Sequence, residues 1–409
     1  MKTAIAVTTL FALTAAAFAA LPSGDKTPAS STPPHVQAVA PAAPTAPAAA
    51  IAIAAAHPKV EVVFVLDTTG SMSGLIQGAK DNIWSIARSM SQAQPTPELK
   101  VGLVAFRDRG DDYITRVTDL STDLDSMYAT LMDFQAAGGG DGPESVNQAL
   151  NDAVQKISWS QDPNSYKVIF LVGDAPPHMD YQDDVKYPQT LKIATSRGIV
   201  VNTIQAGDAP DTKQEWQHIA SLNQGAFFRV DQSGSALAVN TPFDEKIAAL
   251  SRDLDGTRLY YGDVAEQKEA ASKVAATDKL HGGSVAAQAK RALFNASEAG
   301  SANAIGKNDL VDEVSKGKVD LATIDREELP AALRDADVKE RERVVKDTAD
   351  KRSKLQAQIA DLGRQRQEFV ANELKSRKDA PVSLDDQIYA TVKTQGAKKG
   401  LKYSADAAH

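Results

Sequence analysis

Oxygen-bearing side chains gather at three places in the sequence, each a short polar stretch beside apolar residues. They belong to Asp67, Thr69, Ser71, Asp141 and Asp174. Oxygen atoms are the ligands that hard divalent cations prefer, and a hydroxyl supplies an oxygen without adding charge. In Asp67-x-Thr69-x-Ser71, alternate side chains point the same way if the segment is extended. These residue types therefore predict a site for one divalent cation.

The absence of cysteine narrows the choice of metal. None of the 409 residues is a cysteine, which excludes disulfides, thiolate catalysis and cysteine-bound zinc. The six histidines are scattered, and no two of them have a metal-ligand spacing such as HxxxH. An oxygen-rich ligand set favours Mg²⁺, Ca²⁺ or Mn²⁺ over zinc.

The polar clusters lie next to segments that should position them. Residues 60–66 and 167–172 are apolar and β-branched, which predicts strands buried on both faces, and they end directly at the first and third clusters. Asp141 precedes a helix expected over 144–157. In an open parallel sheet, ligands bind beyond the carboxyl ends of the strands. Side chains more than a hundred positions apart can therefore surround one point.

Strands and helices alternate through residues 58–254, which predicts an α/β fold with a doubly wound, mostly parallel sheet. The strand at 99–106 should form an antiparallel edge hairpin with 114–117. Further strands are expected over 199–204 and 226–230, and helices over 75–90, 123–134, 187–197, 212–222 and 243–254.

The sequence around the first cluster resembles a known family. Val-Phe-Val-Leu-Asp67-Thr-Thr-Gly-Ser71-Met is similar to the first motif, DxSxS, of the metal-ion-dependent adhesion site in von Willebrand factor A domains. In that family an Asp and two hydroxyls, a Thr from a second loop and an Asp from a third loop hold a divalent cation, which often binds a partner's carboxylate. The resemblance implies that Asp67, Thr69 and Ser71 fill the first motif. Asp174, in Ile-Phe-Leu-Val-Gly-Asp174, would fill the third.

Two positions depart from the family pattern. Thr69 replaces a serine and keeps the hydroxyl, whereas Asp141, in Gly-Gly-Gly-Asp-Gly-Pro-Glu, stands where the family usually has threonine. A third carboxylate weakens the attraction for a partner's acid and favours Ca²⁺ or a structural role. Glu144 is an alternative second-loop ligand, but we expect it to be an acid in the first helical turn, stabilised by the helix dipole. The competing interpretation of all three clusters is that they are helix caps and turn formers.

The N-terminal residues indicate export. Lys2, the apolar stretch 4–16 and Ala17-Phe18-Ala19 predict a signal peptide over 1–19, with an uncleaved anchor as the alternative. Residues 20–57 are rich in Pro and Ala and predict a disordered linker. We therefore expect a bacterial periplasmic or extracellular protein that keeps no membrane span after cleavage.

Residues 255–409 predict an all-α C-terminal region. Helices are expected over 264–301, with a break at Gly282-Gly283, over 307–316 and over 331–378. The last is long and charged, with apolar residues near heptad spacing, yet Arg352 and Arg366 fall on its apolar side. We expect it to pack on its own chain rather than form a long coiled coil. The tail 395–409 is polar, and we expect it to be frayed.

Enzymatic signatures are missing from the sequence. There is no GxxxxGK[ST], GxGxxG or GxSxG motif, and Thr69 stands where a haloacid dehalogenase-type phosphatase needs its second Asp. A formal net charge of -8 argues against general nucleic-acid binding. The Arg109-Gly-Asp111 tripeptide should be a chance occurrence in a hairpin loop. We expect a non-enzymatic protein without catalytic residues.

Three functions remain open. The favoured one is an exported, metal-dependent module that binds a protein partner through an acidic side chain, which requires an exposed ion and an apolar or concave rim. The second is a scaffold in which the ion only rigidifies loops and the helical region makes the contacts, which requires that region to cover the ion. The third, a metal-dependent hydrolase, requires a pocket with a base near the ion.

Overall fold

The computed structural model describes residues 57–140, 142–231, 240–376 and 384–404. The expected signal peptide, nearly all of the expected linker, and Asp141 lie outside these residues. No helix in the described part of the chain is both long enough and apolar enough to cross a membrane.

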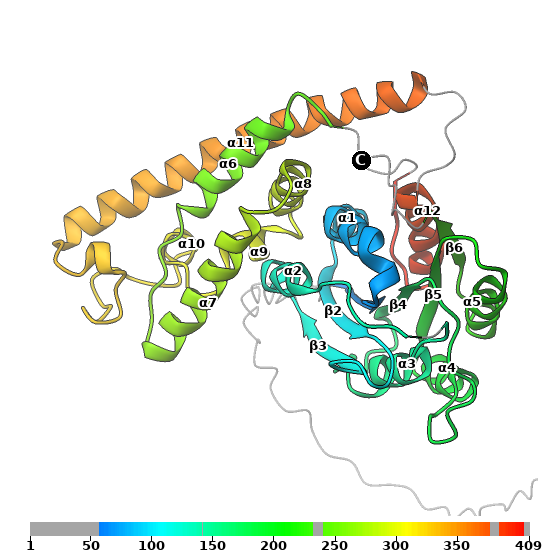
Figure 1. The fold of residues 1–409 in the computed structure, drawn as a ribbon. Coiled ribbons are helices and arrows are strands. Elements are labelled where there is room, and N and C mark those ends of the chain that lie inside the picture. Colours follow the sequence, from blue (N-terminus) through cyan, green and yellow to red (C-terminus); the bar gives the residue numbers. More distant parts are fainter. Residues whose placement is uncertain (1–56, 141, 232–239, 377–383, 405–409) are drawn as a thin grey trace, which may run out of the picture. The chain divides into compact units, whose positions relative to one another are not determined.

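Six strands form one sheet in the order β3-β2-β1-β4-β5-β6, and only the β2–β3 pair is antiparallel (Figure 1). The strands are β1 (Lys59–Asp67), β2 (Glu98–Phe106), β3 (Thr115–Ser121), β4 (Tyr166–Gly173), β5 (Ile199–Ala206) and β6 (Phe227–Val230). The predicted mostly parallel α/β sheet with an antiparallel edge hairpin is confirmed.

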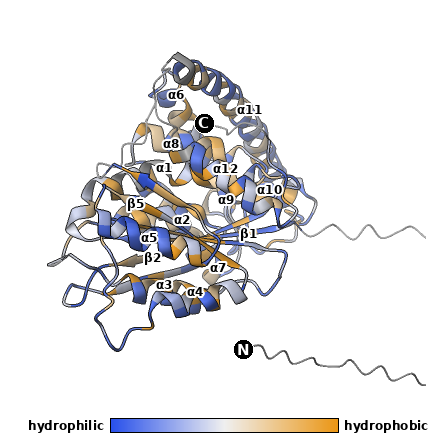
Figure 2. Cartoon of the chain, turned by 90° about the vertical axis from the view of Figure 1, so that its right-hand side faces the viewer, coloured by the Kyte–Doolittle hydropathy of each residue, from blue (hydrophilic) through white to orange (hydrophobic). Residues whose placement is uncertain are grey.

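Helices cover both faces of the sheet because its central strands are apolar on both sides. Successive residues of β1 point to opposite faces: Val62 and Phe64 enter one core cluster, and Val63 and Val65 enter the other. Figure 2 shows the hydrophobic colour concentrated on the strands. The covering helices of the sheet domain are η1 (Gly70–Met72), α1 (Ser73–Ser91), α2 (Leu124–Asp133), α3 (Val146–Gln155), α4 (Tyr187–Ser196) and α5 (Pro210–Leu222).

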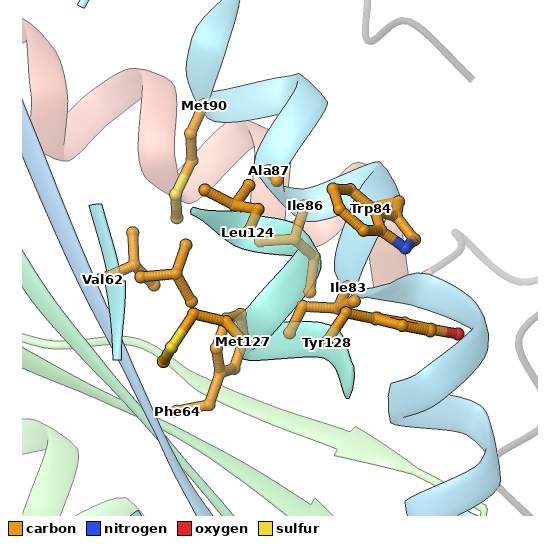
Figure 3. A pocket seen from close by; sticks show the side chains of 11 residues that line it. Val62, Phe64, Ile83, Trp84, Ile86, Ala87, Met90, Leu124, Met127 and Tyr128 are labelled. Atoms are coloured by element: carbon orange, nitrogen blue, oxygen red, sulfur yellow. The ribbon is translucent and has the colours of Figure 1, made fainter. Parts of the chain in front are cut away.

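One face of the sheet holds a narrow apolar pocket between β1, α1 and α2. Leu124, Met127 and Tyr128 of α2 lie across this pocket from Val62 and Phe64 of β1 (Figure 3). All of its lining side chains belong to the buried core of the sheet domain. We therefore regard the pocket as part of the core rather than as a binding site.

The C-terminal region is helical, as expected, and closes onto the sheet domain. Helix α6 (Asp244–Asp255), which was expected to close the sheet domain, packs on α8 and α11 and is described with this region. The helices that follow are α7 (Val264–Leu280), α8 (Val285–Asn295), α9 (Ser301–Ile305), α10 (Leu310–Ser315), η2 (Ala331–Leu333), α11 (Val338–Ser376) and α12 (Leu384–Ala397). The break at Gly282-Gly283 separates α7 from α8, and the side chain of Ser284 caps α8. Helix α11 packs on α6, α8 and α10 of the same chain.

Buried ion pairs explain the two arginines on the apolar side of α11. Arg352 donates to Asp309 at 2.9 Å and to the backbone oxygen of Thr257 at 2.9 Å. Arg366 donates to Asp244 at 2.7 Å. Each guanidinium thus neutralises a buried carboxylate from another element, so α11 is bound to this chain at two points.

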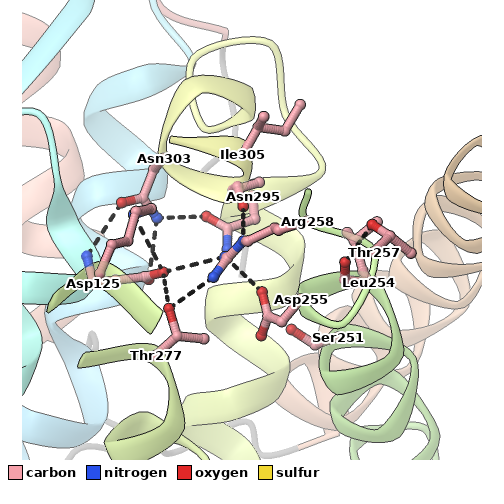
Figure 4. Close-up of polar contacts among 12 residues, drawn as sticks. Asp125, Ser251, Leu254, Asp255, Thr257, Arg258, Thr277, Asn295, Asn303 and Ile305 are labelled. Carbon is pink, nitrogen blue, oxygen red and sulfur yellow. Dashed lines mark hydrogen bonds and ion pairs between the residues drawn. The ribbon is translucent and has the colours of Figure 1, made fainter. Parts of the chain in front are cut away.

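A second buried polar network joins the sheet domain to the helical region (Figure 4). Asp125, at the start of α2, is fully buried and accepts hydrogen bonds from Arg291 and Asn303. Arg258 pairs with Asp255 at 2.7 Å and lies 3.6 Å from Asp125. These contacts connect α2 with α6, α8 and α9.

The tail was predicted wrongly in part. Gln395, expected at the start of a frayed segment, is buried at the end of α12 and bonds to Tyr166 and Asn202. Lys402 forms an isolated antiparallel bridge with Gln94, and Leu401 is buried. Gln395 can be both polar and buried because its hydrogen-bond partners, Tyr166 and Asn202, lie in strands that are distant in sequence.

Candidate metal centre

The first predicted cluster lies where β1 ends, between the two strands that flank β1. Asp67 is the last residue of β1. The backbone N–H of Thr69 donates to Asp67 Oδ1 at 2.9 Å, and Thr69 Oγ1 donates to the same oxygen at 2.6 Å. Thr69 Oγ1 and Ser71 Oγ are 3.3 Å apart. The structure therefore brings the three residues of the first motif together.

One oxygen of Asp67 lacks a partner. The residue is 1% exposed, and its Oδ2 accepts no hydrogen bond from the described residues. Burial, assisted by the charge of Asp174 and opposed by the Thr69 bonds and the backbone N–H of Asp174, raises the pKa of Asp67 to about 7. A buried carboxylate oxygen without a donor is unfavourable, and a bound cation would satisfy it.

Asp174 reaches the same place from β4, which pairs with β1. The preceding Gly173 lies so close to Asp67 that a Cβ on it would come within 3.1 Å of Asp67 Oδ2. The backbone oxygen of Asp174 accepts a hydrogen bond from Thr212 Oγ1 at 3.0 Å, which holds the loop against α5. The negative charge of Asp174 helps to raise the pKa of Asp67 and of Glu144.

The glycine-rich second loop lies across the first. The backbone N–H of Ala137 donates to the Thr68 oxygen at 3.1 Å, and that of Gly70 donates to the Gly138 oxygen at 3.2 Å. Gly138 and Gly139 have φ angles of 77° and 80°, which favour glycine. Asp141 follows two residues later, outside the described residues, so its role as a ligand stays a prediction.

Glu144 lies before the first turn of helix α3 rather than in it, so the preferred interpretation of it as a first-turn acid was wrong. Helix α3 begins at Val146 with no acid in its first turn. The Glu144 side chain is 3% exposed, and its Oε2 accepts no hydrogen bond from the described residues. Burial and the charges of Asp67, Asp108, Asp111 and Asp174 raise the pKa of Glu144 to about 9.

Backbone bonds hold Glu144 between the second and third loops. Its N–H donates to the Pro176 oxygen at 2.9 Å, and its own oxygen accepts from the His178 N–H at 3.0 Å. The Gly-Pro-Glu sequence could have indicated a residue fixed before a helix start. The partner across the loops could not be read from the sequence.

The hairpin loop between β2 and β3 braces the site, which sequence reasoning missed. Arg107 is buried and donates to the backbone oxygens of Thr68 at 3.2 Å and Gln135 at 2.8 Å, so it connects the first two loops. Asp111 accepts from the N–H of Gly139 at 3.0 Å. These residues fix the loops but provide no sequence signal beyond their polarity.

The Arg109-Gly-Asp111 tripeptide has an internal role. Arg109 donates to Asp183 at 2.9 Å and to Asp184 at 2.6 Å, and its guanidinium lies 4.1 Å from the ring centre of Tyr181. Since Asp111 also bonds within the protein, both charged side chains of the tripeptide have partners in this chain.

The oxygens at this site could hold a cation only as a mixture of carboxylates and hydroxyls. Among the described residues, no three acidic or histidine side chains converge into a ready-made metal cage. The first motif brings together one carboxylate and two hydroxyls, and Asp174 follows the neighbouring strand β4. Such a set of oxygens, with waters added, is typical of Mg²⁺ and Ca²⁺ sites.

Comparison with known proteins agrees with this arrangement of strands and loops. Residues 61–242 match the family model described as the von Willebrand factor A domain. This segment is a von Willebrand factor A domain. The match ends before α6, so it leaves out the whole helical C-terminal region.

The matches to curated relatives cover only part of this chain and of each relative. The alpha-protein kinase vwkA of Dictyostelium discoideum is 27% identical over 121 residues, which are 29% of this chain and 19% of that protein. The von Willebrand factor A domain-containing protein 7 of Rattus norvegicus is 34% identical over 120 residues, 29% of this chain and 12% of that protein. The chain thus spans less than a fifth of the length of either relative.

Matches to solved structures also cover less than half of this chain. The hypothetical protein BatB from Bacteroides thetaiotaomicron is 19% identical, with a TM-score of 0.33 and coverage of 42% of this chain and 90% of that one. Proximal thread matrix protein 1 from the mussel byssus, solved with a zinc-occupied MIDAS motif, is 18% identical, with a TM-score of 0.34 and coverage of 42% of each chain.

Proposed function

We propose that this protein is an exported module that binds a protein partner through a divalent cation held by its von Willebrand factor A domain. The observation that carries the proposal is the orphaned Oδ2 of Asp67, buried beside Thr69, Ser71 and Asp174. No described donor satisfies this oxygen, and its neighbours offer further oxygens of the kind a hard cation needs.

The residues that would hold the ion come from three loops. Asp67, Thr69 and Ser71 would contribute from the first loop and Asp174 from the third, with Asp141 or Glu144 from the second. A bound Mg²⁺, Ca²⁺ or Mn²⁺ supplies positive charge that can accept an oxygen from a partner's acidic side chain. Three or more carboxylates around one ion favour Ca²⁺ among these metals.

The surroundings of the site favour binding over a purely structural ion. Ser71 and the glycines of the second loop are exposed, so the opening faces solvent. Met179 and Val185, on the segment that follows Asp174, are 43% and 40% exposed and offer apolar contact area. Exposed apolar side chains beside a polar centre are typical of docking surfaces.

Two contacts of α12 and the C-terminal tail lie away from this opening. Gln395 bonds to Tyr166, the first residue of β4, and Lys402 pairs with Gln94, which precedes β2. Both contacts lie near the amino ends of the strands, opposite to the end where Asp67 lies. The scaffold function, in which the helices cover the ion, is therefore the weaker candidate.

A binding role also fits the environment of His178 better than a hydrolytic one. His178, the histidine on the segment after Asp174, is 4% exposed, and its Nδ1 lies 2.8 Å from Asp180 Oδ1. Its ring stacks on Tyr181 at 4.0 Å. A buried, stacked histidine is poorly placed to act as a base on a solvent-borne substrate, and we propose no catalytic residue.

The proposal is tested by capture from an envelope extract with wild type and Asp67→Ala, each with and without chelator. Asp347→Ala, an exposed aspartate on α11, is the matched control. We expect a specific partner to be retained by wild type and the control, and lost with Asp67→Ala or chelator. If neither Asp67→Ala nor chelator reduces capture of the partner, metal-dependent binding is refuted and the scaffold function is favoured.

Two direct measurements separate the parts of this proposal. Calorimetric titration with Mg²⁺ and Ca²⁺ should show one site in wild type and none in Asp67→Ala. If wild type and Asp67→Ala bind the metal equally well, the ion is held elsewhere. Expression of the full chain in a bacterium, followed by fractionation and N-terminal sequencing, tests export. An intact N-terminus in the cytoplasmic fraction would contradict it.

A further inference from the structure

A cleft of about 590 Å³ lies between α1, α8 and α11, away from the metal centre. Arg88 and Gln92 line it from α1 and its end, Ser297 from the turn after α8, and Arg364 and Gln367 from α11. Small-molecule sites commonly have volumes of roughly 300–1,000 Å³. The cleft is therefore large enough to hold a ligand rather than a few waters.

The charged side chains around the cleft are not all paired with a residue of opposite charge. Arg366, which lies on the same helix as Arg364, is neutralised by Asp244 at 2.7 Å, and Arg364 donates to Asp361 at 2.6 Å. Arg88 has no hydrogen bond or ion pair to its guanidinium from any residue that the structure describes. Among the described residues, Arg88 is thus the cation at this cleft that forms no ion pair.

The surroundings of Arg88 make this unusual. Arg88 is half-buried, and burial together with the nearby charge of Arg366 lowers the pKa of Arg88 to about 10. The side chain still carries its charge at neutral pH. Removing a cation from water without a partner is unfavourable, so such a group is a natural anchor for an anion.

The acidic residue that lines the cleft, Glu298, does not form an ion pair with Arg88. Glu298 is exposed and accepts a hydrogen bond from Thr96 Oγ1 at 2.8 Å. Ser297 Oγ donates to the Phe294 oxygen and accepts from the Gly300 N–H. These polar groups have their own partners, and neither forms a contact that would neutralise the arginine.

The walls of the cleft are fixed by packing. Gly363 lets α11 approach α8, because a Cβ there would lie 2.5 Å from Leu293 Cδ2. The Arg366–Asp244 pair holds α11 to α6, which in turn packs on α8. The cleft is therefore formed before any ligand arrives, which lowers the entropic cost of binding.

We propose that the cleft between α1, α8 and α11 binds a small molecule bearing an oxyanion, carboxylate or phosphate, through the guanidinium of Arg88. The planar fork of arginine matches both groups by two parallel hydrogen bonds. Gln92 and Gln367, which line the same cleft, supply neutral polar groups for the rest of the ligand. The site joins the sheet domain to the helical region and is independent of the metal centre.

The test uses the full chain in chelator, so that the metal centre cannot bind the probe. Arginines are labelled with phenylglyoxal in the presence of increasing inorganic phosphate or, separately, citrate, and the labelled peptides are quantified by mass spectrometry. We expect label at Arg88 to decrease with one or both probes, and the more protective probe identifies the preferred oxyanion. Arg343, exposed on α11 and paired with Glu340, should not respond.

Variants decide whether the arginine itself recognises the anion. Arg88→Gln should weaken calorimetric affinity for the protective probe by about 10- to 100-fold, whereas Arg343→Gln should leave it unchanged. Arg88→Lys, which keeps the charge but loses the fork, should fall between. Absent protection of Arg88 in wild type, or equal affinity of a folded Arg88→Gln, would overturn the proposal. Should Arg88→Gln fail to fold, the wild-type labelling decides alone.

Discussion

Arg291 holds both carboxylate oxygens of Asp125, with Nε to Oδ1 and Nη2 to Oδ2 each at 2.7 Å, across 166 positions of sequence. Asp125 begins helix α2 of the sheet domain, and Arg291 lies in α8 of the helical region. Both side chains are buried. This buried bidentate pair connects the two regions.

Removing one charge of this pair should be costly. We expect Asp125→Asn to lower the free energy of unfolding by about 3–5 kcal/mol, because Arg291 would stay buried with less compensation. Denaturant unfolding monitored by tryptophan fluorescence and by circular dichroism measures the change. Asp347→Asn, on exposed α11, is the control and should unfold like wild type. An equal effect of both variants would contradict the connection.

The same pair predicts acid sensitivity. Arg291 and other nearby cations hold the pKa of Asp125 far below its ordinary value of about 4, against the effect of burial. Because the folded pKa is lowered, the stabilisation is complete above the ordinary pKa and is lost as pH falls toward the folded value. The unfolding free energy should therefore decrease steadily below about pH 4.5.

Asp125→Asn removes this titration, so its stability should depend less on pH in the same range. Asp255, whose pKa is also lowered by Arg291 against burial, should supply the remaining slope. Parallel pH profiles for wild type and Asp125→Asn would show that the acid sensitivity arises elsewhere.

Cation binding at the metal centre should release protons. Without metal, burial raises the pKa of Asp67 to about 7 and that of Glu144 to about 9. A cation must displace those protons, so metal affinity should increase as pH rises from about 6 to about 9. Calorimetry in buffers of different ionisation enthalpy counts the protons released. Affinity that does not change with pH would mean that neither group binds the ion.

Glu144→Gln and Asp141→Asn identify the ligand from the second loop. If Glu144 binds the ion, its replacement should weaken Ca²⁺ binding by at least about tenfold, while Asp141→Asn changes affinity less. At pH 7 the metal-free stability of Glu144→Gln should match wild type, since the raised pKa already leaves this carboxyl protonated. The reverse order of affinities would assign the role to Asp141.

Local patterns predicted the sheet well. Val62 to Leu66 are buried on both faces, and Asp67 ends the strand as its sequence suggests. The first motif could be found because its three residues are neighbours in sequence. Asp174 could be found because it follows a strand whose apolar composition is equally clear.

Interactions between distant residues could not be predicted in the same way. Glu144 was interpreted as an acid of the first helical turn from its place before α3. The residues that hold it come from other loops, which local spacing does not reveal. Arg352 and Arg366 interrupted an apolar pattern, and only the fold reveals the carboxylates that neutralise them. Burial of a polar residue depends on a partner that spacing does not specify.

The position of α12 affects how the chain can be divided in the laboratory. The family match stops at residue 242, but Gln395 of α12 fills a place between Tyr166 and Asn202 of the sheet. A recombinant fragment ending at residue 242 would lack α12 and would therefore expose the side chains of Tyr166 and Asn202 to water. Such a fragment would aggregate or misfold for reasons unrelated to its cation, so binding studies need the whole polypeptide.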